Sequence, residues 1–136
     1  MKRVAAGILV GLTAAAVVTP AHAAPSRNLY MVKDLQYIDG VYYGDFATLA
    51  KKGSKVVGAV GAFSSEYTCI RGTVSNGKLR AKIYENGVPI GSFTRKWVGS
   101  GSQQRIKGMT SVTYTEASTY LESDPRSFIQ DCRSAT

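Results

Sequence analysis

The chain has 136 residues and a formal net charge of +8. This length suits one domain and excludes folds that need about 200 residues or more, such as a (β/α)₈ barrel. The single histidine, His22, lies near the N-terminus. If that segment is removed, no imidazole remains, which excludes histidine-dependent nucleophilic catalysis and histidine-containing zinc or copper sites. We therefore expect no cofactor, no metal and no enzymatic activity.

The first 23 residues have the pattern of a secretory signal peptide. Met1-Lys2-Arg3 is positively charged, residues 4–18 are uncharged and apolar, and Ala21-His22-Ala23 has the small-x-small pattern that signal peptidase recognises. The apolar run is shorter than the roughly 20 residues that a membrane-spanning helix needs. The sequence predicts cleavage after Ala23, secretion to the extracellular space or cell envelope, and no transmembrane segment in the mature chain.

The mature chain is predicted to be an irregular lead-in over residues 24–36 followed by a single secreted β domain over residues 37–136. From Tyr37 onward it is rich in Val, Ile, Thr, Tyr and Phe, with frequent glycine, which is typical of a mainly β protein. The short links favour antiparallel meander connections and leave a small barrel and a sandwich as alternatives. About six strands are expected, over 41–49, 55–63, 66–75, 78–85, 90–98 and 105–115. Residues 55–63 are apolar on both faces, so this strand is expected to be central or covered.

The clearest local signal is Asn76-Gly77, a pair that favours a two-residue type I′ turn. Folding the chain at this turn places Val74 opposite Leu79 and Ile70 opposite Ile83, all on one face. A one-residue slip would invert both faces, so this register is well specified. The opposite face then carries a row of basic side chains, namely Arg71, Lys78, Arg80 and Lys82.

A second pair, Asn86-Gly87, follows ten residues later. A strict two-residue turn there would point Phe93 and Trp97 outward, and Pro89 lacks a donor for the ladder. We therefore expect a longer or bulged connection. It would turn both aromatic side chains inward, with Arg95 between them.

Cys69 and Cys132 are the two cysteines of the chain, and an even number of cysteines in an exported protein predicts a disulfide. In the register given above, Cys69 lies on the solvated face. The bond would therefore hold the tail across the outside of the sheet. Within the tail, Asp124-Pro125 favours the start of a short helix, whereas Phe128-Ile129 would equally suit a last strand. For residues 118–136 the sequence leaves helix and strand as alternatives.

Basic residues gather in the middle of the chain. Residues 51–107 hold eleven of its seventeen Lys and Arg side chains but only two acidic residues. This asymmetry makes Arg71, Lys78, Arg80 and Lys82 a candidate anion-binding face. The partners considered are an anionic cell-surface polymer, a lipid head group or an acidic protein; export disfavours nucleic acid. Solubility alone accounts for the same charge pattern.

The sequence thus predicts a secreted binding module of unknown ligand. It would contact anionic surfaces or polymers through the basic face, or hold a small apolar ligand inside the barrel. One alternative is an inhibitor of a hydrolase that uses a protruding loop, such as 86–89 or 99–104. Another is a small carboxylate-based enzyme, although the spacing of Asp and Glu singles out no catalytic pair.

Overall fold

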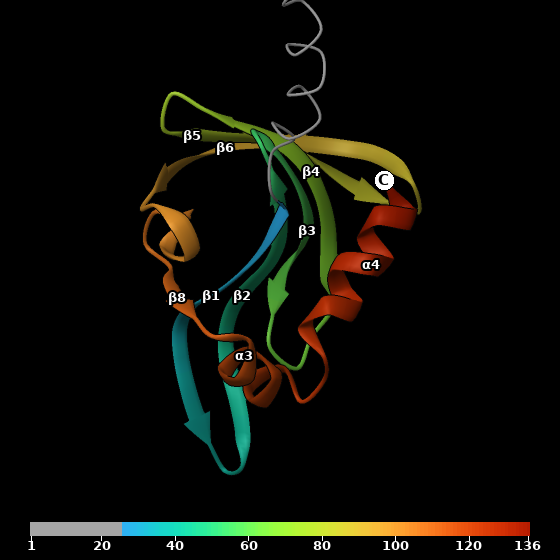
Figure 1. The fold of residues 1–136 in the computed structure, drawn as a ribbon. Helices are drawn as coiled ribbons and strands as arrows, with labels where there is room; N and C mark the ends of the chain where they lie inside the picture. The colour runs from blue at the N-terminus through green and yellow to red at the C-terminus, as the bar shows by residue number, and fades with distance from the viewer. Residues whose placement is uncertain (1–25) are drawn as a thin grey trace, which may run out of the picture.

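A computed structural model describes residues 26–136 (Figure 1). The predicted signal peptide and its cleavage site lie outside the described residues. The elements follow one another as β1 (Ser26–Ile38), β2 (Val41–Lys52), β3 (Lys55–Ala62), β4 (Tyr67–Ser75), β5 (Lys78–Glu85), β6 (Val88–Val98), the 3₁₀ helix η2 (Gly101–Gln103), β7 (Arg105–Ile106), β8 (Thr110–Val112), α3 (Tyr114–Leu121) and α4 (Pro125–Ala135).

The strands form one antiparallel sheet in the order β7-β6-β5-β4-β3-β2-β1-β8. Strands β1 to β6 are a meander, because each pairs with the next along the chain. The segment 105–112 then supplies both outermost strands, since β7 pairs with β6 and β8 pairs with β1. The sheet therefore curls into a near-closed barrel (Figure 1). The prediction of a mainly β, antiparallel fold is confirmed, and the barrel is the correct alternative.

The inner face of the curled sheet holds the main hydrophobic core. Alternate residues of each strand point inward, as the two-residue period of a strand requires. Burial of these side chains supplies the main driving force for closing the sheet. The buried members of this core are Leu29, Met31, Ala47, Leu49, Val56, Ile70, Leu79, Ala81 and Trp97.

The two C-terminal helices cover the outer face of β1 to β3, where a second hydrophobic layer forms (Figure 1). Tyr30, Val57 and Ala59 of the sheet pack there with Ile129 and Cys132 of α4. Strand β3 is therefore buried on both sides, which confirms the prediction drawn from its continuous apolar sequence. The disulfide joins Cys69 of β4 to Cys132 of α4 and confirms both the pairing and its place outside the sheet. None of the described helices has the length and apolar content required to cross a bilayer.

Both helices begin at side-chain caps. The Asp124 carboxylate accepts a hydrogen bond from the Arg126 backbone N–H, and Pro125 occupies the first turn of α4, so helix is the correct alternative for this part of the tail. Helix α3 begins at Thr113, which forms a reciprocal capping box with Glu116. Thr113-x-x-Glu116 is visible in the sequence, and it is the signal that sequence reasoning missed for α3.

The prediction of an irregular lead-in over 24–36 is wrong from Ser26 onward. Residues Ser26–Ile38 form β1, the longest strand, which pairs with β2 on one side and with β8 on the other. Its central residues, Leu29 to Val32, are buried on both faces: the core lies on one side and α3 on the other. A strand covered on both faces has no alternation of polar and apolar residues, so its period cannot be read from the sequence.

The prediction of one strand over 105–115 is also wrong. Gly108 has φ +97°, a conformation that glycine adopts readily, and it separates β7 from β8. Tyr114 then begins α3. The segment changes direction because its two halves pair with opposite edges of the sheet.

The two Asn-Gly pairs form the turns of neighbouring hairpins. Asn76 and Gly77 both have positive φ, and the register of β4 and β5 is the predicted one. Asn86-Gly87 also forms a two-residue turn, with the expected bulge one step beyond it, inside β6, where the register shifts. Because of this shift Phe93 pairs with Ala81 and lies on the inner face, as predicted for Phe93, Arg95 and Trp97.

Candidate anion-binding surface

The hairpin formed by β4 and β5 carries the four predicted basic residues on the outer face of the sheet. Arg71 lies directly opposite Lys82, Arg80 lies opposite Thr73, and Lys78 lies opposite Ser75. All four basic side chains are exposed, whereas the residues between them, such as Leu79, are buried in the core. The alternation of the strands therefore separates the cations completely from the apolar side of the hairpin.

Two further lysines extend this surface on the flanking strands. Lys55 of β3 pairs with Thr73, and Lys96 of β6 pairs with Lys78, so both lie on the same outer face. The inward placement of Phe93 and Trp97 could have identified Lys96 from the sequence, whereas Lys55 requires the register between β3 and β4. We call the six residues together the basic outer face: Lys55, Arg71, Lys78, Arg80, Lys82 and Lys96.

The basic outer face is hollowed rather than flat. A depression of about 550 Å³ is lined by Lys55, Arg71, Arg80 and Lys82, together with Tyr84. A smaller depression of about 240 Å³ shares Lys55 and Arg71 and adds Arg133 of α4. The Arg71 Nε donates a hydrogen bond to Thr136 Oγ1 over 2.9 Å, which holds its guanidinium at the end of α4.

Like charges oppose each other at several positions of this surface, since Lys55 also lies opposite Lys52 of β2. Arg71 pairs with Lys82, and Lys78 pairs with Lys96, an arrangement that destabilises a sheet. Among residues 26–136, the one ion pair within 4 Å joins Asp124 and Arg126, so no carboxylate neutralises the basic outer face. Six cations with no carboxylate within 4 Å create a positive potential that favours an anion placed over the depression.

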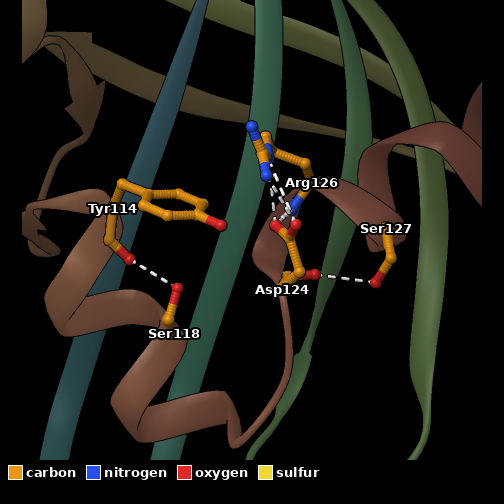
Figure 2. Close-up of polar contacts among 5 residues, drawn as sticks. All are labelled: Tyr114, Ser118, Asp124, Arg126 and Ser127. Carbon is orange, nitrogen blue, oxygen red and sulfur yellow. Dashed lines mark hydrogen bonds and ion pairs between the residues drawn. The ribbon is translucent and has the colours of Figure 1, made fainter.

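A second polar cluster joins the two helices (Figure 2). Arg126 Nη2 donates to Asp124 Oδ2 over 2.8 Å, and its guanidinium lies 4.8 Å from the centre of the Tyr114 ring. Ser127 Oγ donates to the Asp124 carbonyl oxygen over 2.7 Å, and Ser118 Oγ donates to the Tyr114 carbonyl oxygen over 2.8 Å. The hydrogen bonds from Arg126 lower the pKa of Asp124 to about 2.

This cluster has the features of a structural joint. A carboxylic acid that acts as a general acid near neutral pH needs a raised pKa, and that of Asp124 is lowered. Its oxygens are already used to cap α4 and to bind Arg126. Within the part of the chain that the structure describes, no group of three or more His, Cys, Asp or Glu side chains could hold a metal ion.

The two loops that the inhibitor alternative would use differ in how tightly they are held against the barrel. Loop 99–104 contains η2, contacts β1, and is tied down by the Trp97 Nε1 hydrogen bond to Gln104 Oε1. Loop 86–89 comprises the tight β5–β6 turn and the first two residues of β6, and it exposes Val88 beside exposed Ile90. The β1–β2 hairpin extends well beyond the barrel (Figure 1) and exposes Tyr37 and Ile38 at its tip; sequence reasoning missed it because β1 was not recognised.

These features define a class of protein: a near-closed antiparallel β-barrel whose outer surface is helix-covered on one half and basic on the other. No protein-family model matches the chain, and no curated protein or solved structure shows significant similarity to it.

Proposed function

We propose that this protein is a secreted binding module that holds an anionic polymer on the basic outer face. The observation that carries the proposal is the pairing of Arg71 with Lys82 and of Lys78 with Lys96, without a neutralising carboxylate on any of these residues. A polyanion laid along the sheet would bridge the like charges and remove their repulsion.

The shape and chemistry of the surface favour a polymer over a membrane. The cations are spread over β3 to β6, so successive anionic groups of an extended chain can each meet one. Proteins that bind lipid surfaces insert apolar side chains beside their cations. None of the large exposed apolar side chains of the described residues belongs to positions 69–84, and Val88 and Ile90 of β6 lie at the opposite end of that strand from Lys96.

Binding to a sulfated polysaccharide, with the neutral parent polysaccharide as control, tests the proposal. Affinity for the sulfated polymer should fall steeply as salt rises from about 50 to 500 mM, because each neutralised charge releases counterions. Reversing Arg80→Glu together with Lys82→Glu should weaken binding by about ten-fold or more.

Arg95→Glu together with Lys107→Glu is the matched control. It changes the net charge by the same amount but acts on residues that line a separate depression on the inner side of the sheet, so polymer binding should change much less. Equal losses in the two double variants would show that only net charge matters and would overturn the proposal. So would the absence of binding at low salt, or tighter binding to vesicles of anionic lipid than to the polymer.

A further inference from the structure

The opposite side of the sheet contains an open depression of about 600 Å³, which we call the inner cavity. It lies at the end of the inner face near the β3–β4 connection, where the hydrophobic core opens to solvent. Its apolar lining is half-buried and packs against the main core. The volume lies within the roughly 300–1,000 Å³ of small-molecule sites. The apolar side chains that line it are Val60, Ile83, Phe93, Ile106 and Met109.

Charged side chains surround the mouth of this cavity. Lys33, Arg95 and Lys107 line it together with one carboxylate, Asp45, and all four are exposed. Lys33 lies opposite Asp45 in the β1–β2 ladder, but among the described residues these two side chains form no ion pair. Three cations against one carboxylate leave the mouth positive.

Arg95 is held at the boundary between the apolar lining and the charged mouth. Its guanidinium lies 5.2 Å from the centre of the Phe93 ring, and its Nη1 donates to the Thr94 carbonyl oxygen over 3.0 Å. Stacking of this kind orients the planar guanidinium. The remaining N–H groups of the fork are free to bind a carboxylate in a bidentate manner.

We propose that the inner cavity binds a small amphiphilic anion, an alkyl or aryl chain that carries one carboxylate. The apolar chain lies against Ile83, Phe93 and Met109, and the carboxylate meets Arg95 and Lys107 at the mouth. A neutral apolar ligand would leave these cations partly desolvated without a partner, which costs free energy. A cationic ligand would face three like charges.

Three probes of equal chain length test the charge requirement: dodecanoate, dodecanol and dodecyltrimethylammonium, each below its micelle-forming concentration. Calorimetry should show that dodecanoate binds at least about ten-fold more tightly than dodecanol, and that the cation binds most weakly. Trp97 gives a second readout, because it is the single tryptophan of the chain and pairs with Ile106. Its fluorescence should change with dodecanoate.

The variants separate this site from the basic outer face. Arg95→Glu with Lys107→Glu should weaken dodecanoate binding by about ten-fold or more and leave dodecanol binding unchanged. Asp45→Asn should tighten dodecanoate binding, because it removes the one carboxylate at the mouth. Melting curves of each variant establish that it is folded.

Arg80→Glu with Lys82→Glu should not alter dodecanoate binding, although it should weaken polymer binding by about ten-fold or more. The proposal is overturned if dodecanoate and dodecanol bind equally, if neither binds, or if the outer variant loses dodecanoate binding. The polymer proposal stands or fails independently, since its residues project from the other side of the sheet.

Discussion

The outer surface of the sheet divides into two halves of opposite character. Over β1, β2 and most of β3 it is apolar and covered by α3 and α4, and from Lys55 at the start of β3 across β4 to β6 it is basic and open. The boundary runs between adjacent strands, where buried Val57 of β3 lies directly opposite exposed Arg71 of β4. The strand geometry is the same on both sides, so the outward side chains, and the helices that cover the apolar ones, decide which half is core and which half is exposed to solvent.

The disulfide lies at this boundary. On β4, Cys69 is the outward-facing residue that precedes Arg71. Its disulfide partner, Cys132 of α4, is fully buried. Tyr67, the outward residue before Cys69, donates a hydrogen bond to Asp131 of α4 over 3.1 Å. Strand β4 thus anchors α4 along one edge and leaves the rest of its outer face free.

Removing the disulfide should weaken the attachment of α4 to β4, on which the difference between the covered and the open half depends. Cys132→Ser frees a 63-residue loop in the unfolded chain, and closing such a loop stabilises a protein by about 4 kcal/mol. The melting temperature should fall by roughly 15 °C or more, as measured by circular dichroism. Reduction of the parent protein should give a similar loss. Equal melting temperatures for variant and parent would contradict the anchoring role.

A pair of single substitutions compares the halves directly. Ile129 of α4 is buried against the covered half, and Ile129→Ala should cost roughly 3 kcal/mol because it leaves a cavity. Arg80 is exposed on the open half, and Arg80→Ala should change the free energy of unfolding by about 0.5 kcal/mol or less. Urea denaturation measures both. A large loss for Arg80→Ala would mean that the basic outer face has a structural role.

The joint between α3 and α4 should make the covered half sensitive to acid. Arg126 lowers the pKa of Asp124 from 3.8 to about 2, so the ionised carboxylate stabilises the folded state above pH 3.8. This contribution is lost as the pH falls towards 2. Asp124→Asn keeps a capping side chain but cannot titrate, so its stability should fall less over this interval. Parallel pH profiles of the two proteins would contradict the assignment.

The sequence predicted those parts whose signals are local. The β4–β5 hairpin is specified by one Asn-Gly turn and by strict alternation, so its register and the outward direction of Arg80 could be read directly. The start of α4 is specified by Asp124-Pro125. Predicting the disulfide required only the number of cysteines and the inference that the protein is exported.

The inner cavity could not be predicted, because it depends on contacts between distant segments. Arg95 was expected to point inward, but Lys33 belongs to a strand with no readable period and Lys107 follows a two-residue strand. These residues meet only when the segment 105–112 connects the two edges of the sheet. Long-range pairing of this kind leaves no periodic signal in the sequence.

The segment 105–112 also has a consequence for self-association. The free edge of a sheet offers unpaired N–H and C=O groups, on which a second chain can add a strand and begin to aggregate. Here β7 occupies part of the β6 edge and β8 occupies part of the β1 edge. Strands of two and three residues are themselves too short to serve as templates. One short stretch of chain thus protects both edges, and its detachment would expose them together.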